Sequence, residues 1–219
     1  MRLLITSDIH GHLENIQPFS QIIRKELPSA IVICGDITHF GTLSDAANIL
    51  REFTGLGLTL FVPGNCDPPE LAEQPILENA VNLHAKCIHM LGSFFIGVGG
   101  SIPTPFETPF ENGEEEVDQI LGTAVGQCPK VFPRILVSHN PPFGTDADKT
   151  LIGSHVGSKS IRSFIDANSP IMVACGHIHE SRSSHTLGNT VVINPGPFHK
   201  GYYALAEVDT KVSVILKEI

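Results

Sequence analysis

Residue types that can bind a metal ion follow five short, mostly apolar runs of the sequence. The runs span residues 3–6, 30–34, 59–62, 135–138 and 171–175. The polar residues that follow them are, in chain order, Asp8 and His10, Asp36, Asn65 and Asp67, His139, and His177 and His179. Carboxylate, imidazole and amide groups together suit Mn²⁺, Fe²⁺, Zn²⁺, Co²⁺ or Ni²⁺, whereas an all-oxygen set would favour Mg²⁺ or Ca²⁺. The pattern therefore predicts a site for borderline divalent cations, with Mn²⁺ as the first choice.

These candidates outnumber the ligands that one ion can use, so two ions that share a carboxylate explain them better. Two ions about 3.5–4 Å apart can clamp the attacking and leaving oxygens of a phosphate ester and lower the pKa of a bridging water. Phosphate esters need such help because their uncatalysed hydrolysis is very slow. The expected chemistry is hydrolysis of a phosphodiester or phosphomonoester through a metal-bridging hydroxide. A single structural zinc fits less well, because the set is large and rich in oxygen.

Each motif taken singly has a simpler explanation. Gly35-Asp36 and Pro63-Gly64-Asn65 are turn sequences, and a lone histidine is usually a surface residue or a satisfied core residue. We expect that simpler role for His84, His89, His185 and His199. The joint occurrence of all five groups, each at the end of a predicted strand, favours the functional explanation.

The elements that must position these residues alternate between strands and helices in the first part of the chain. The spacing of apolar residues predicts helices over 15–26 and 44–53, the second with Ser44 as its N-cap. Strands that alternate with helices form a parallel sheet, and ligands bind where its strands end. Asp8, Asp36 and Asn65 should therefore converge on one edge.

The rest of the chain is richer in strands and predicts a second sheet within a single domain, residues 1–219. Strands are expected over 94–98, 190–193, 202–208 and 212–216, the last two as a hairpin that turns at Asp209-Thr210. Helices are expected over 114–121 and 158–166.

The segment 99–116 is rich in Gly, Pro, Phe and Glu, which predicts a mobile loop able to act as a substrate lid. Phe106 and Phe110 offer flat surfaces on which a nucleobase could stack. Packing of the loop on its own phenylalanines explains them at least as well.

Composition limits the partners and the compartment. The net charge of −9 argues against long nucleic acids and anionic membranes. The five cysteines are scattered and lack a Cys-x-x-Cys pair, so neither a disulfide framework nor a cysteine-rich zinc site is expected. The N-terminus lacks the apolar core of a signal peptide, and no apolar run approaches the roughly 18 residues of a membrane span. We expect a cytoplasmic protein that acts on a small phosphate ester, with the oligomeric state left open, a homo-oligomer included.

The sequence resembles the calcineurin-like metallophosphoesterases in a series of motifs, found between residues 5 and 197: Asp8-x-His10, Gly35-Asp36, Gly64-Asn65-x-Asp67, His139 and Gly176-His177-x-His179. The stretches 138–142 and 194–196 look most like the small stand-alone phosphoesterases of bacteria and archaea. The resemblance implies an α/β fold, a two-sheet α/β/β/α sandwich of the metallo-dependent phosphatase type. It also implies one ion held by Asp8, His10 and His179, a second held by Asn65, His139 and His177, and Asp36 as the bridge.

One position departs from the family's pattern. Many members have Gly-Asn-His where this chain has Cys66, and that histidine is thought to protonate the leaving oxygen. A thiol is a poorer proton donor than an imidazolium near neutral pH. Three consequences are open: the enzyme prefers good leaving groups, or His12, His39 or His155 supplies the proton, or Cys66 only packs and activity is low. We slightly favour a packing role for Cys66 itself.

We assign catalytic roles to Asp36, Asn65 and His39, the last because it is nearest in sequence to the bridging carboxylate. Asp67 is expected to orient a neighbour. The sequence shows no arginine cluster for the extra charge of a monoester, so we lean towards diesters. Two alternatives stay open: a nuclease of small substrates or cyclic nucleotide phosphodiesterase, and a metal-bound scaffold without turnover.

Overall fold

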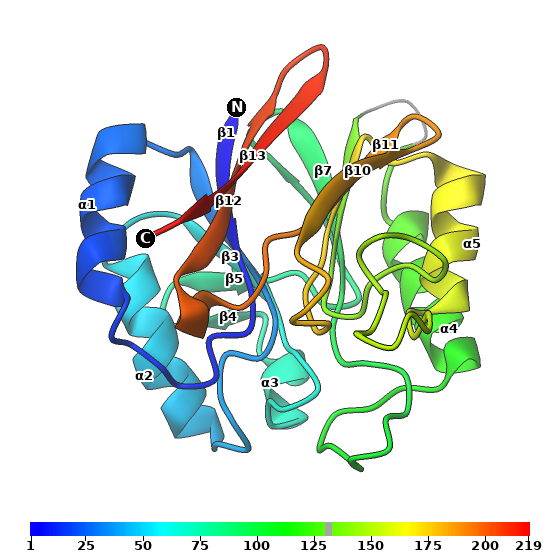
Figure 1. Ribbon diagram of the computed structural model, residues 1–219, viewed down its shortest axis with the longest axis horizontal. Helices are drawn as coiled ribbons and strands as arrows, with labels where there is room; N and C mark the ends of the chain where they lie inside the picture. Colours follow the sequence, from blue (N-terminus) through cyan, green and yellow to red (C-terminus); the bar gives the residue numbers. More distant parts are fainter. Residues whose placement is uncertain (130–132) are drawn as a thin grey trace.

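The computed structural model describes residues 1–129 and 133–219. Two β-sheets pack face to face, with helices on the outer face of each sheet (Figure 1). The α/β class and the two-sheet sandwich expected from the sequence are therefore confirmed. No helix in the described part of the chain is both long enough and apolar enough to cross a membrane.

The first sheet is built around three parallel strands, β1 (Arg2–Thr6), β2 (Ala30–Cys34) and β3 (Thr59–Val62). These strands are mostly apolar and buried because both of their faces are covered, as in most parallel sheets. The sheet is extended on one side by β12 (Tyr202–Val208) and β13 (Val212–Glu218), and on the other by β5 (Ala80–Asn82) and β4 (Ile76–Leu77). The predicted hairpin is present, since Val208 pairs with Val212.

The second sheet has six strands in the order β10-β11-β9-β8-β7-β6. Their bounds are β10 (Ser183–Leu187), β11 (Thr190–Asn194), β9 (Met172–Ala174), β8 (Arg134–Ser138), β7 (Ser93–Val98) and β6 (Cys87–Met90). Strands β7, β8, β9 and β11 run parallel, so the ends of β8 and β9 face the same edge. The edge strands β6 and β10 were not predicted from the sequence.

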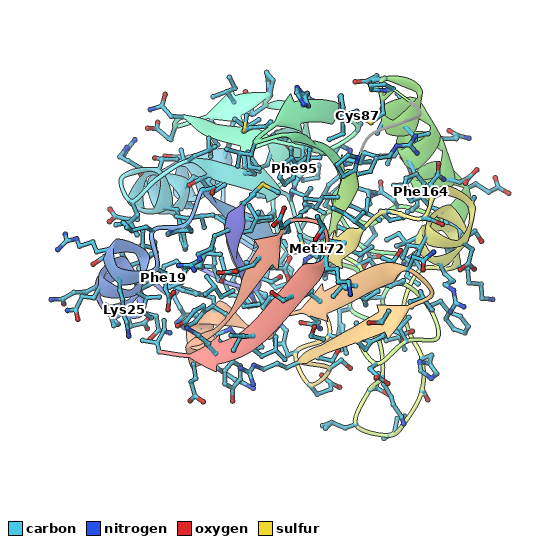
Figure 2. All side chains as sticks on the ribbon, turned by 90° about the horizontal axis from the view of Figure 1, so that it is seen from above. Phe19, Lys25, Cys87, Phe95, Phe164 and Met172 are labelled. Atoms are coloured by element: carbon cyan, nitrogen blue, oxygen red, sulfur yellow. A yellow bond between two sulfur atoms is a disulfide. The ribbon has the colours of Figure 1, made fainter. Side chains whose placement is uncertain are left out.

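The core lies in the layer between the sheets, where Phe95 and Met172 lie with side chains of β1, β2 and β3 (Figure 2). Helices α1 (Ile16–Glu26) and α2 (Leu43–Thr54) cover the first sheet, chiefly through Phe19 and Phe53. Helices α4 (Glu114–Gly126) and α5 (Lys159–Asn168) cover the second sheet, on the opposite side of the molecule (Figure 1). The short helices α3 (Glu70–Glu73) and η1 (Phe198–Lys200) lie in connections.

The start of α2 differs from the prediction. Its N-cap is Thr42, and Ser44 lies inside the first turn. The Thr42 hydroxyl accepts the Asp45 N–H, and the Asp45 carboxylate accepts the Thr42 N–H, so the two residues form a capping box. Thr42 is the cap because the acidic residue lies three positions after it, where its carboxylate can reach back.

One disulfide is present among the described residues, although no disulfide framework was expected from the scattered cysteines. Cys87 of β6 and Cys128, just after α4, are bonded with their Cα atoms 5.7 Å apart (Figure 2 labels Cys87). The pair is separated by 41 residues, so nothing local in the sequence links the two positions. Cys34, Cys66 and Cys175 are free and buried.

Candidate metal centre

The ends of the parallel strands of both sheets meet at one edge of the sandwich. Within the first sheet, the Asp8 N–H donates to the Gly35 carbonyl at 3.0 Å. Across the sheets, the His177 N–H donates to the Asp8 carboxylate at 3.2 Å. The His139 ring donates from Nδ1 to the Cys34 carbonyl at 2.7 Å. These bonds bring the polar residues that follow β1, β2, β3, β8 and β9 into one cluster.

Three of the predicted ligands form one group. The ligand atoms of Asp8, His10 and His179 all lie within 4.8 Å of one another. The Nε2 atoms of His10 and His179 face each other at 3.3 Å, and His179 Nε2 is 3.3 Å from an Asp8 carboxylate oxygen. Two imidazole nitrogens converging on a carboxylate form a donor set that suits a borderline divalent cation.

Asn65, His139 and His177 lie close to one another, and His139 also lies close to Asp36. His139 Nε2 is 2.8 Å from Asn65 Oδ1, and the His139 and His177 ring centroids are 5.0 Å apart. The Asp36 carboxylate lies between this group and the first. Its Oδ1 is 3.4 Å from His139 Nε2, and its Oδ2 is 3.6 Å from His10 Nε2.

Hydrogen bonds from outside the cluster fix the direction in which its groups point. Because His139 Nδ1 is committed to the Cys34 carbonyl, its Nε2 is directed into the cluster. Asn65 donates from Nδ2 to Thr108 Oγ1 at 3.0 Å, which leaves its Oδ1 facing His139. The buried Asp67 accepts the backbone N–H groups of residues 37, 38 and 64, which agrees with the orienting role expected for it.

The backbone at this edge adopts an uncommon conformation. Asp8, His10, Asp36 and His177 have φ values of 55°, 50°, 50° and 70°, in the left-handed region that side chains other than glycine rarely occupy. Such conformations persist where the surrounding structure enforces them, and they gather at functional sites. Gly64 is required for a related reason, since a Cβ atom there would overlap the backbone and carboxylate of Asp36.

The electrostatics of the cluster favour metal-binding protonation states at most of its members. Burial raises the pKa of Asp36, but His139 and His10 outweigh it and hold this pKa well below the usual range. Burial also raises the pKa of Asp8, but His179 and His139 lower it by more, so this pKa is below its usual value. Burial and the charge of His139 lower the pKa of His177 to about 4. Ionised carboxylates and neutral imidazoles are the forms that bind metals. For His139 itself, burial lowers the pKa but Asp36 raises it to about 9, so a metal would have to displace a proton.

The predicted proton donors lie in different settings. His39 is exposed, and its ring centroid is 5.3 Å from that of His10. Cys66 is buried, and burial followed by the charge of Asp36 raises the pKa of its thiol far above the usual value, which fits a packing role. His155 is bonded to the buried Asp148 at 2.7 Å, and His12 pairs with Glu14 at the surface.

His199 is a residue of this centre that the sequence did not reveal. It was expected to be an ordinary surface or core histidine, but its ring lies 5.4 Å from His179 and 5.7 Å from His10. Its Nδ1 donates to the Asp8 carbonyl at 3.1 Å. With His12 and His39, these three histidines line a cavity of about 300 Å³. No spacing pattern signals His199, because η1 reaches the centre only through the tertiary fold.

Comparisons with known proteins agree with this geometry. The model of the calcineurin-like phosphoesterase family matches residues 1–181. An uncharacterized protein of Methanocaldococcus jannaschii, MJ1162, is 39% identical over 221 residues, which cover 99% of this chain and 95% of the relative. The crystal structure of TT1561 from Thermus thermophilus is 22% identical, with a TM-score of 0.78 and coverage of 99% and 98% of the two chains. The structure of an archaeal phosphodiesterase is 19% identical, with a TM-score of 0.56 and coverage of 99% and 100%. At these identities the two structures share the fold with this chain.

Proposed function

The chain belongs to the calcineurin-like phosphoesterase family, a dimetal-dependent family, and from this premise we propose that it hydrolyses a small phosphodiester with two divalent metal ions. Mn²⁺ is the proposed ion, with Fe²⁺, Zn²⁺, Co²⁺ and Ni²⁺ as substitutes that the same donor set accepts. A phosphomonoester is the second substrate class to test.

The position of Asp36 is the observation that carries the proposal. Its two carboxylate oxygens face different groups, one 3.6 Å from His10 Nε2 and the other 3.4 Å from His139 Nε2. A carboxylate placed in this way can serve two ions at once, whereas an isolated zinc site would use only one group.

The proposed ligands follow the two groups. One ion would be held by Asp8, His10 and His179. The other would be held by Asn65, His139 and His177, and Asp36 would bind both ions. Two bound ions would supply hydroxide near neutral pH and neutralise the charge of the phosphate. Low pKa values keep Asp8 and Asp36 ionised for this role. Asn65 is held in place by its bond to Thr108.

His39 is the residue that we propose to deliver a proton to the leaving oxygen. It is exposed beside His10, and it lines a cavity with His10 and His179. The buried thiol of Cys66 is a poor donor, since its pKa is raised. A poor donor at position 66 supports a preference for diesters with good leaving groups.

The name of the archaeal phosphodiesterase that shares this fold also supports a diester. The net charge of −9 supports a small substrate over long nucleic acid. A cyclic nucleotide or a short oligonucleotide remains within the proposed class, because each presents one diester to the centre.

The test compares an aryl phosphodiester with the matching monoester, using metal-stripped protein with Mn²⁺ added back. The Asp36→Asn variant should lose turnover by on the order of a thousandfold, because the shared carboxylate is removed. Asp118→Asn, at an exposed position of α4, is the control. Turnover that survives in Asp36→Asn would refute the shared site. Tight binding of two ions with no turnover on either ester would point to a metal-bound scaffold.

A further inference from the structure

A second, larger cavity opens beside the metal centre. Its volume is about 600 Å³, within the range of small-molecule sites. One wall is the stretch 177–180, which includes His177 and His179 of the centre. The opposite walls are the segment 102–106, together with Thr150 and Val156. The cavity therefore adjoins two of the proposed metal ligands.

The lining of the cavity is mostly apolar. Its apolar side chains are Ile102, Pro103, Pro105, Phe106, Val156 and Ile178. No lysine or arginine occurs among the described residues that line it. The acidic residue in the lining is Glu180, which is exposed and accepts the Leu151 N–H at 3.2 Å. The cavity thus disfavours a second phosphate and suits an uncharged group that can donate a hydrogen bond to a carboxylate.

The wall formed by residues 102–106 is fixed relative to the metal centre. Phe110 donates its N–H to the Asn65 carbonyl at 3.1 Å, and Thr108 accepts the side-chain amide of Asn65. Glu111 accepts the hydroxyls of Thr104 at 2.7 Å and Thr108 at 2.6 Å. This chain of bonds connects a proposed metal ligand to the cavity wall, so the wall is held at a fixed place relative to Asn65.

Phe106 is the most exposed part of the wall. Its side chain is 80% exposed, although it lies between polar and proline residues on an ordered turn, with its own N–H bonded to Thr104. The lining combines two prolines and Phe106 with the imidazole rings of His177 and His179, and such flat, rigid surfaces favour a flat ring over a flexible chain.

We propose that this cavity binds an uncharged aromatic or heteroaromatic ring in the alcohol part of the ester, such as a nucleobase, and that Phe106 is its stacking surface. The inference rests on the proposed function, because it concerns the substrate of the same centre. It narrows the substrate to diesters that carry a ring, with no further phosphate on that side.

The test measures binding in the absence of turnover. Ligand-detected NMR titrations with adenosine, which has no phosphate, would use metal-stripped and Mn²⁺-loaded protein. We expect saturable binding to both forms, weakened about tenfold in Phe106→Ala and less in Phe106→Leu, which keeps apolar volume but loses the ring. Leu27→Ala, an exposed apolar position after α1, is the control.

Equal binding by the wild type and Phe106→Ala would overturn the proposal, as would equal binding of 1-octanol and adenosine. Because binding is read without catalysis, the two proposals fail separately. If the protein hydrolysed aryl diesters but did not bind adenosine, only the proposal of a ring-binding cavity would be refuted. If adenosine binding depended on Phe106 but no ester were hydrolysed, the cavity assignment would stand and the proposed hydrolase activity would be refuted.

Discussion

The metal-facing edge and the wall of the large cavity are neighbours, but they are built in opposite ways. At the edge, polar residues are buried directly after strands, and Asp8, Asp36 and His139 are at most 3% exposed. In the loops beside the cavity, apolar side chains are exposed, with Phe106 at 80% and Leu151 at 87%. The comparison teaches that the candidate metal ligands follow rigid strand ends, whereas the cavity that we propose for recognition is walled by loops, which can vary without disturbing the sheets.

The largest effect should come from adding one methyl group to the edge. Gly64→Ala places a Cβ against the backbone and carboxylate of Asp36, so the shared ligand must move. We expect kcat/KM on an aryl diester to fall on the order of a hundredfold to a thousandfold. Gly122→Ala in α4 is the matched control, since its Cβ would meet nothing within 4 Å. Near-normal activity in Gly64→Ala would mean that the edge is less rigid than the contacts indicate.

A smaller effect is expected where the two regions join. Thr108→Val removes the hydroxyl that links Asn65 to Glu111. Loss of a group that orients a metal ligand typically costs about 10-fold to 100-fold in metal affinity or activity, and we expect a loss in that range. Isothermal titration with Mn²⁺ and steady-state kinetics would measure it. Thr108→Ser keeps the hydroxyl and should retain both the Mn²⁺ affinity and the activity. Equal values for the Val and Ser variants would show that this hydroxyl does not orient Asn65.

A third effect is on stability, not on activity, and concerns the pH dependence of the base of the cavity-wall loop. The Gly99 N–H donates to His84 Nδ1 at 2.9 Å, and burial, with a lesser contribution from Lys86, lowers the pKa of His84 to about 4. Because this folded-state pKa lies below the unfolded value of about 6.5, stability is fully present above pH 6.5 and is lost as the pH falls towards 4. The loss should reach at most about 3 kcal/mol.

Urea unfolding of the metal-stripped protein between pH 7 and 4 would measure this dependence. His84→Asn keeps an acceptor near the Gly99 N–H but does not titrate, so its stability should fall less over the same interval. Identical pH profiles for the two proteins would show that His84 is not the group responsible.

Much of the sandwich could be predicted because its signals are local. Strands β2 and β3 were placed with their observed bounds, and the starts and ends of β1 and α1 were placed within one residue. A buried strand between helices appears in the sequence as an apolar run, and the glycine or aspartate that ends it appears directly afterwards. The short strands β4, β5, β6 and β10 lack such signals, because their pairing depends on neighbours more than on their own residues.

The sequence by itself determined which residue types stand at the strand ends, and parallel pairing then required them to share an edge. The tertiary structure alone decided which of them face one another, as with His10 and His179, 169 residues apart. It also decided the place of His199, the Cys87–Cys128 disulfide and the hydrogen bond that Asn65 donates to Thr108. The physical reason is the same in each case. Strand periodicity and turn chemistry act over a few residues, whereas these contacts form only after loops from both sheets have packed against each other.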